Sequence, residues 1–303
     1  MRMRAKALWW GTLAVGGAGT GALTLAAFAP LLMRAVPDAT MQLDLVCLFL
    51  PTSSDWAAHL MSYAILLLLV GSLGLGVVRF VGQTVRTRRT VRRLLAFSQP
   101  VDAGLARLLG RLGLTGRLDL VQTPLPIAFC YGLRRPRICL STGMVTALDG
   151  EQLTALLWHE QAHLLHRDPL KVAVGRAWTA MFFFLPLART LYSGYLLAKE
   201  IEADAYACTR CGGNGPLTAA LARLLDVQDA CGLAGPQTAG STDALEMRVD
   251  SLLGHAPVFR IPAQILFVSS AILGGLVGLE LLLTQAGVNN ALWNLSHSPL
   301  GGC

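Results

Sequence analysis

Charged residues are scarce in this sequence. They make up 14% of the 303 residues, whereas hydrophobic residues make up 53%. Ordinary soluble domains carry about 25% charged residues, because their surfaces face water on all sides. The composition therefore argues against an ordinary soluble domain and favours a membrane protein.

Cysteine is also too infrequent and too irregularly spaced for a disulfide scaffold, since the chain has seven cysteines in all. Cys208 and Cys211 form a C-x-x-C, but no second pair follows at zinc-knuckle spacing and no thioredoxin-like strand precedes it. We interpret this pair as part of a helix-packing surface. Cys47 and Cys303 are both expected outside the membrane, and nothing in the sequence decides whether they pair.

The net charge of +7 comes from basic residues that flank apolar segments. They are concentrated at Arg2, Arg4 and Lys6, and again at Arg86, Arg88, Arg89, Arg92 and Arg93. This placement is typical of the positive-inside rule for membrane proteins. We therefore expect a lipid bilayer as a partner and no direct contact with nucleic acid.

Three apolar segments are long enough to cross a bilayer, which takes about 20 residues. They run over Ala7–Met33, Ala57–Val81 and Ala263–Leu283. The first is longer than the apolar core of a cleavable signal peptide, which is about 7–15 residues. The loop before the second segment carries acidic residues, so the N-terminus is expected in the cytoplasm and this loop outside.

These segments predict three regions. Residues 1–85 form an N-terminal membrane region with two transmembrane helices, residues 86–260 a cytoplasmic module, and residues 261–303 a last transmembrane helix with a short outer tail. The fold class is therefore a mainly α membrane protein, with about three transmembrane helices and a cytoplasmic α+β domain. The expected location is the inner (plasma) membrane, crossed several times. The oligomeric state is left open, and a homo-oligomer is compatible with the sequence.

Within the module, hydrophobic periodicity and turn residues predict the local elements. Helices are expected over Val91–Leu112 and over Gln152–His166, the second ending at Asp168-Pro169. Two short strands are expected over Ile127–Tyr131 and Arg137–Ser141, joined by a turn at Gly132–Pro136.

The second of these helices carries an H-E-x-x-H motif, His159-Glu160-Gln161-Ala162-His163. Residues four apart lie on one face of a helix, so both imidazoles can reach a single metal ion. The glutamate between them lies beside the open position of the metal, where it can take a proton from water. The sequence therefore predicts a catalytic zinc site with Glu160 as the general base.

A catalytic zinc takes three protein ligands, so a third is required. The candidates further along the chain are His166, Asp168, Glu200, Glu202 and Asp204. Glu200 and Asp204 share a helical face, so one carboxylate can bind the metal while the other orients a ligand histidine. His166 is expected too far along the helix of His163, and Asp168 follows the end of that helix.

Five sequence pieces around this motif carry a resemblance to a known family. They are Ala128–Ile138 (AFCYGLRRPRI), Ser141–Met144 (STGM), the H-E-x-x-H, Arg167-Asp168 and Glu200-x-x-x-Asp204. In this order the chain resembles the bacterial membrane zinc peptidases of the beta-lactam sensor and antirepressor type, the methicillin-resistance signal-transducer peptidase family. It is also similar to a related clan, the prenyl-protein and heat-shock membrane peptidases. The resemblance covers about Thr123 to Arg210.

The resemblance implies one zinc ion per chain and a zincin-like (gluzincin) domain with a small β-sheet. It assigns His159, His163 and Glu200 as ligands, Glu160 as the general base and Asp204 as the supporting carboxylate. Two positions depart from the patterns: Ala203 matches the related clan rather than the sensor type, and Ile127 stands where the clan commonly has Asn. Because few residues follow the last predicted helix, no outer penicillin-binding domain and no direct beta-lactam sensing are expected.

The function implied is a membrane-bound zinc endopeptidase that cleaves cytoplasmic or membrane-proximal proteins. By family analogy its role is regulatory and its substrate a transcriptional repressor. The alternatives are a membrane quality-control protease and a non-catalytic signalling protein that retains the zinc fold. A substrate is expected to pair with the strand near Arg137–Ser141, and Arg248 is either an oxyanion-stabilising residue or an ordinary surface arginine.

The apolar segment Val172–Tyr192 conflicts with a simple topology. If it crossed the bilayer once, Glu200 would lie on the opposite side from the two histidines. The segment is therefore expected to be a hairpin, a re-entrant segment near Pro186 or an interfacial helix, with the active site on the cytoplasmic side of the membrane.

Overall fold

The computed structural model describes residues 4–35, 56–230, 247–255 and 259–297. Cys47, Cys303 and the acidic loop before the second apolar segment lie outside these residues, so the predictions on them stay predictions. The chain divides into two compact units, each built from three separate stretches. The first comprises Met1–Gly11, Val78–Ala177 and Thr190–Arg260, and the second Thr12–Val77, Trp178–Arg189 and Ile261–Cys303.

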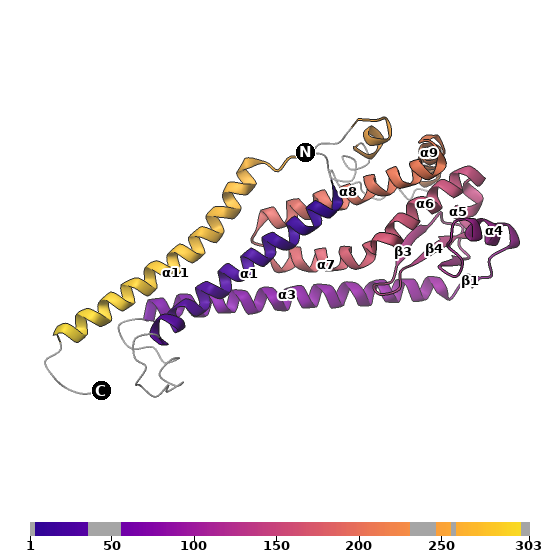
Figure 1. Cartoon of the computed structure of the whole chain (residues 1–303). Coiled ribbons are helices and arrows are strands. Elements are labelled where there is room, and N and C mark those ends of the chain that lie inside the picture. Colours follow the sequence, from indigo (N-terminus) through magenta and orange to yellow (C-terminus); the bar gives the residue numbers. More distant parts are fainter. Residues whose placement is uncertain (1–3, 36–55, 231–246, 256–258, 298–303) are drawn as a thin grey trace. The chain divides into compact units, whose positions relative to one another are not determined.

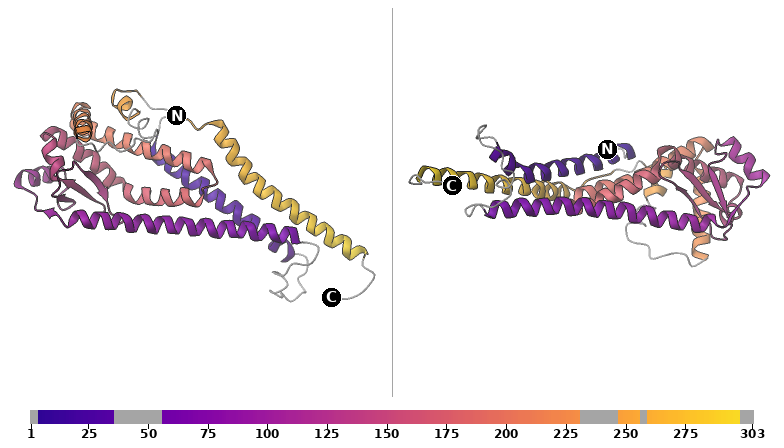
Figure 2. Two further views of the ribbon diagram at one scale, coloured as in Figure 1. Left: turned by 180° about the vertical axis from the view of Figure 1, so that it is seen from behind. Right: turned by 90° about the horizontal axis from the view of Figure 1, so that it is seen from below.

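The three apolar segments each form a long helix, α1 (Ala5–Ala35), α3 (Trp56–Leu95) and α11 (Ala263–His297). Both views of Figure 2 show α3 as one continuous helix. Within the described residues, Tyr63–Leu95 is the one stretch that is long and apolar enough to cross a membrane. The three-span count and the boundaries at residues 85 and 260 therefore stay predictions.

The helix predicted over Val91–Leu112 is confirmed at both ends but is interrupted in the middle. Helix α3 continues through its basic end to Leu95, the short strand β1 (Ser98–Gln99) follows, and α4 occupies Ala103–Arg111. Pro100 separates the two helices because proline lacks the N–H that a helix interior requires. Asp102 then caps α4, since its carboxylate accepts the backbone N–H of Leu105 at 3.2 Å.

A four-stranded sheet lies at the centre of the first unit. Its strands are β1, β2 (Leu118–Val121), β3 (Ala128–Tyr131) and β4 (Arg137–Ser141), in the order β1-β2-β4-β3. Strand β4 pairs with β2 in parallel and with β3 antiparallel, so it is an interior strand. Both predicted strands are confirmed, and β3 forms one edge of the sheet.

Helix α6 (Gly150–His166) packs against β3 and β4 (Figure 1). It follows the short helix α5 (Thr142–Ala147), which Ser141 caps. The start of α6 is fixed by a capping box: the Asp149 side chain accepts the Gln152 N–H, and the Gln152 side chain accepts the Asp149 N–H. Leucines from α4, β2, β4 and α6 form the core beneath, among them Leu105, Leu120, Leu140, Leu153 and Leu157.

The segment Val172–Tyr192 forms parts of two helices. Helix α7 (Asp168–Met181) ends before the turn at residues 182–185, and α8 (Pro186–Cys211) follows. The Tyr192 hydroxyl donates to the Val172 carbonyl at 3.0 Å, and a Cβ on Gly175 would lie 2.2 Å from the Tyr192 ring. The close approach of α7 and α8 therefore needs glycine here. The segment thus folds back on itself between α7 and α8, and how it meets the membrane stays a prediction.

Helix α9 (Gly215–Ala230) packs on α6. Cys208 and Cys211 pack against the buried cluster of Ala155, Ala207 and Leu217 between these helices. Both are free thiols, which agrees with the predicted packing role.

Candidate metal centre

His159 and His163 lie one turn apart on the buried face of α6. Their side chains are almost fully enclosed, and their Nε2 atoms lie 3.1 Å apart. The rest of this helix face packs in the leucine core, which fixes the rotation of α6 about its axis. The spacing of the motif therefore gives the geometry that the sequence predicts.

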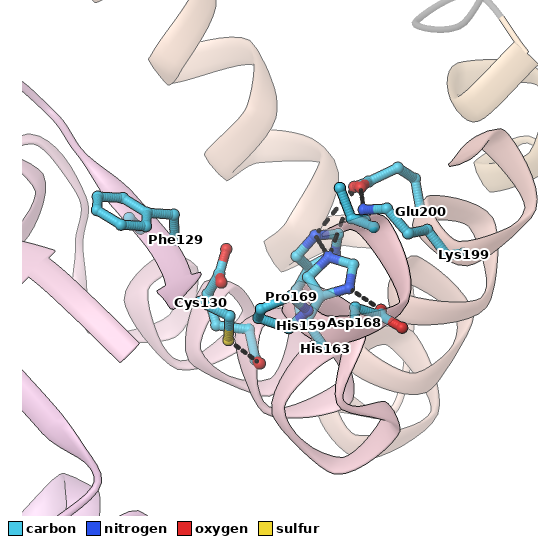
Figure 3. A pocket seen from close by; sticks show the side chains of 11 residues that line it. Phe129, Cys130, His159, His163, Asp168, Pro169, Lys199 and Glu200 are labelled. Carbon is cyan, nitrogen blue, oxygen red and sulfur yellow. Dashed lines mark hydrogen bonds and ion pairs between the residues drawn. The ribbon is translucent and has the colours of Figure 1, made fainter. Parts of the chain in front are cut away.

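Glu200 reaches the same point from α8 (Figure 3). Its Oε2 lies 3.5 Å from Nε2 of His159 and 3.6 Å from Nε2 of His163. Ligand atoms about 2.0–2.1 Å from a tetrahedral zinc ion would be about 3.3 Å apart. The three donor atoms thus already have the mutual separations that a zinc ion requires, and the set of two imidazoles and a carboxylate is typical of catalytic zinc.

A second carboxylate orients each histidine. Oδ1 of Asp204 lies 2.8 Å from Nδ1 of His159, and Oδ2 of Asp168 lies 2.7 Å from Nδ1 of His163. With Nδ1–H donating to a carboxylate, Nε2 keeps its lone pair for a metal. Asp168 therefore holds His163 in the tautomer that metal binding needs. At His159 the close Asp204 carboxylate favours the same tautomer, although the contact does not have hydrogen-bond geometry.

The sequence predicts Asp168 as a candidate third ligand at the end of α6. The structure instead places it behind His163, where it contacts the ring nitrogen that does not face the metal. It is buried, and it also accepts a hydrogen bond from the Tyr195 hydroxyl at 3.2 Å. Arg167 takes a left-handed conformation after α6 (φ 54°) and turns the chain back, which brings Asp168 to His163.

The other candidates for the third ligand lie elsewhere. His166 is exposed. Glu202 accepts the backbone N–H of Ala5 at 2.7 Å and does not join the cluster. Among the described residues, Glu200 is the one carboxylate grouped with both histidines.

The electrostatics of the cluster favour bound cations. Burial by itself lowers the pKa of His159, but Asp204 and Glu200 outweigh it and raise this pKa to about 9. Burial raises the pKa of Glu200, whereas the two histidines and Lys199 bring it well below its usual range. Glu200 is therefore ionised, and the two imidazoles lie where a positive charge is stabilised. A metal ion and protons compete for the nitrogens of these imidazoles.

Glu160 lies next to the three donors with a free oxygen. The residue is 6% exposed, and its Oε2 is buried without a hydrogen-bond partner among the described residues. An unsatisfied buried carboxylate oxygen is costly, so it is expected to face a polar group that binds there. Its backbone carbonyl is held by the Cys130 thiol at 3.1 Å, and burial raises the pKa of that thiol.

Arg248 is not an ordinary surface arginine. Its Nε and a terminal nitrogen donate to the two oxygens of Asp204 at 2.8 and 2.9 Å, and another nitrogen lies 3.8 Å from Glu200 Oε2. Asp204 is therefore bound by His159 on one side and by a bidentate guanidinium on the other. The structure supports a positioning role for Arg248, and the oxyanion role stays a prediction.

Two cavities open beside the cluster, with Ala128 of β3 in the wall of both. One, of about 330 Å³, is lined by Phe129, Cys130 and Lys199 together with the ligand set. The other, of about 350 Å³, is mainly apolar, with Met144, Leu156, Leu217, Leu221 and Leu224 among its lining residues. Lys199 contacts the Glu200 carboxylate directly.

The predicted substrate strand is wrong. Arg137–Ser141 is β4, whose two edges are already paired with β2 and β3. The open edge near the cluster belongs to β3. Ser141 N–H donates to the Ile127 carbonyl, so Ile127 and Phe129 face β4. By the alternation of an antiparallel pair, Ala128 and Cys130 then turn their backbone groups toward the open edge.

The fold and this cluster agree with a comparison to known families. Residues 101–195 match the model of peptidase family M48. The match includes strands β2, β3 and β4, both histidines, Glu160 and Asp168, and it ends before Glu200. The third donor, Asp204 and Arg248 lie beyond the matched residues, and the geometry of this chain brings them to the cluster.

Curated relatives show a similar, partial likeness. The chain is 32% identical over 68 residues to a protease HtpX homolog of Thermoplasma acidophilum, which is 22% of each chain. It is 31% identical over 91 residues to protease HtpX homolog 1 of Saccharolobus solfataricus, covering 28% of this chain and 29% of that protein. The matches thus span less than a third of these relatives, and neither points to the beta-lactam sensor type.

Proposed function

We propose that this protein is a membrane-bound zinc-dependent endopeptidase. The observation that carries the proposal is the convergence of His159 Nε2, His163 Nε2 and Glu200 Oε2 to zinc-ligand separations, with the unpartnered Oε2 of Glu160 beside them. The match to peptidase family M48 and to HtpX homologues supports the same reaction. An intact Glu160 distinguishes the proposal from a structural metal site, which needs no base.

The chain's own residues divide the work of peptide hydrolysis. A zinc ion, when bound, lowers the pKa of water to about 7 and polarises the substrate carbonyl. Glu160 accepts a proton from the attacking water at Oε2 and later delivers it to the leaving amine. Asp168 and Asp204 hold the two imidazoles in register throughout, and Arg248 holds Asp204.

The substrate is proposed to be an extended protein segment. Strand β3 offers an open edge to which such a segment can add, with main-chain hydrogen bonds to Ala128 and Cys130. The apolar cavity on one side then accepts a hydrophobic side chain next to the cleaved bond. A folded substrate cannot present such a strand, so unstructured or membrane-proximal segments are favoured.

Attachment to the membrane is supported by α3, with its apolar stretch and its basic end at Arg86–Arg93. The positive-inside rule places this end, and with it the catalytic unit, on the cytoplasmic side. After washing membranes at high pH, the protein should remain in the pellet. Its release to the supernatant would contradict the proposal.

The regulatory role rests on the resemblance to the antirepressor type, and quality control is the alternative. The two predict different substrates in the cell. Labelling of new N-termini in cells that carry wild type or Glu160→Gln should reveal cleavage of one repressor for the regulatory role. Cleavage of many damaged membrane proteins would assign quality control instead.

The reaction itself is tested with purified full-length protein in detergent. Wild type, Glu160→Gln and Glu151→Gln are compared for zinc content and for cleavage of casein, an unstructured protein. Glu151 is a matched control because it is an exposed glutamate in the first turn of the same helix. Zinc in all three, with cleavage lost only in Glu160→Gln, is the expected result. Equal cleavage by Glu160→Gln would disprove the proposed base.

A further inference from the structure

A cavity separate from the metal cluster is lined by arginines. Its volume is about 520 Å³, and its wall includes Arg117, Arg134, Arg135, Arg137 and Arg167 together with Leu164 and Leu165. These residues come from three places: the start of β2, the turn between β3 and β4, and the end of α6. None of them takes part in the proposed reaction.

Most of this positive charge is not neutralised by the protein. Arg137 forms a bidentate pair with Asp119, with both contacts at 2.6 Å. Among the described residues, the other four arginines have no carboxylate within ion-pair distance, and all four are exposed. Guanidinium groups that converge on one cavity repel each other unless an anion binds between them.

Arg167 provides an independent observation. It is the only non-glycine residue with a positive φ within the described part of the chain (φ 54°). This position follows the last residue of α6, where glycine is the usual choice because it has no Cβ to strain. A basic side chain also stabilises the carbonyl end of a helix, but it can do so from the last turn without strain. An arginine at this position therefore indicates a use for its side chain, which lines the cavity.

We infer that the arginine cavity binds the phosphate group of an anionic phospholipid. Planar guanidinium groups match phosphate oxygens in bidentate geometry. The lipid source is supported by Leu165, which is 55% exposed at the cavity, since its apolar side chain suits the glycerol and acyl part of a lipid. It is also supported by the exposed arginines at 86, 88, 89, 92 and 93, which lie in the same unit at the basic end of the apolar helix α3. Anionic lipids are attracted to such basic clusters at the cytoplasmic surface.

The test is isothermal titration of the full-length protein in a nonionic detergent with dioctanoyl phosphatidylglycerol. Wild type is expected to bind one molecule per chain and to bind dioctanoyl phosphatidylcholine at least about tenfold more weakly. The double variant Arg134→Gln/Arg135→Gln should weaken phosphatidylglycerol binding at least about tenfold, as expected for loss of charge-assisted hydrogen bonds. The matched control is Arg107→Gln/Arg223→Gln, which removes two exposed arginines outside the cavity and should bind as wild type does.

Arg167→Gly separates binding from folding. It should weaken phosphatidylglycerol binding at least about tenfold while the unfolding temperature stays the same or rises, because glycine relieves the positive φ. Wild-type affinity in Arg167→Gly or in the double variant would overturn the inference. Binding of inorganic phosphate without binding of phosphatidylglycerol would overturn the lipid as its source. The same titrations in Glu160→Gln should match wild type, so failure of the peptidase proposal would not affect this result.

Discussion

Nδ1 of His163 lies 2.7 Å from Oδ2 of Asp168, which is five positions further along the chain and past the end of α6. The left-handed turn at Arg167 makes this possible, because it brings the start of α7 back beside the last turn of α6. One local backbone feature thus supplies the carboxylate that orients a metal-binding histidine.

Asp168→Asn is predicted to weaken zinc binding by about 10–100-fold, because a neutral amide accepts the imidazole N–H less strongly than a carboxylate anion does. Zinc affinity is measured by competition with a chromogenic chelator. Tyr195→Phe, which removes the second donor to Asp168, should have a smaller effect in the same direction. Glu151→Gln serves as the control on α6, and an unchanged affinity in Asp168→Asn would show that the contact does not position His163.

Arg248→Gln is predicted to destabilise the fold and weaken zinc binding together. Asp204 is 1% exposed, so loss of its bidentate partner leaves a buried carboxylate with His159 alone. Breaking such a pair typically costs about 3–5 kcal/mol. Unfolding in denaturant and chelator competition measure the two effects.

The same variant separates the two roles considered for Arg248. If Arg248 stabilised the oxyanion directly, Arg248→Gln would lower kcat while zinc affinity and stability stayed at wild-type values. Arg248→Lys should rescue only part of the positioning effect, because an ammonium group cannot bind both oxygens of Asp204 in the same geometry.

The sequence predicted the parts of the site that are local. The H-E-x-x-H spacing on a leucine-rich helix placed His159 and His163, and β4 was predicted with the bounds observed. It could not show that β4 is interior, because its second partner, β2, lies some twenty residues earlier and pairs with it in parallel. Hydrophobic periodicity continues on both sides of Pro100, so it predicts one helix where the structure has two.

The contact between Asp204 and Arg248 could not be predicted from the sequence. Their contact joins residues 44 positions apart, and the helical pattern around Glu246–Val249 carries no sign of a buried partner. The spacing of Asp204 from Glu200 predicts its role as a supporting carboxylate. That Arg248 binds this carboxylate is visible only in the three-dimensional structure.

The open edge of β3 predicts a specific loss of function. Ala128→Pro removes a backbone N–H that faces this edge, and proline is tolerated on edge strands. Casein cleavage should fall while zinc content stays at one ion per chain. Ala128→Val keeps the N–H and is the matched control for a larger side chain. Full activity of Ala128→Pro would show that substrates do not add to β3.

The pair of Asp119 and Arg137 predicts an acid-sensitive contribution to stability. The hydrogen bonds from Arg137 lower the pKa of Asp119 below that of the unfolded chain. The pair therefore stabilises the fold above an unfolded pKa of about 3.9, and this stabilisation is lost as the pH falls through the lower folded value. Because Arg137 is partly exposed, the effect is on the order of 1 kcal/mol or less.

Thermal unfolding of wild type and Asp119→Asn over a pH series measures this contribution. Wild type should be the more stable protein at pH 7, and the difference should shrink below about pH 4. A difference that grows as the pH falls would contradict the assigned pKa direction.

The most direct test of the zinc site is X-ray absorption at the zinc edge of the full-length protein loaded with one equivalent of zinc. The expected spectrum has nitrogen and oxygen neighbours at about 2.0–2.2 Å, with the histidine contribution reduced in His163→Ala. A sulfur shell near about 2.3 Å would place the metal on cysteines such as Cys208 and Cys211 instead. That result would contradict the assignment of His159, His163 and Glu200 as the ligands.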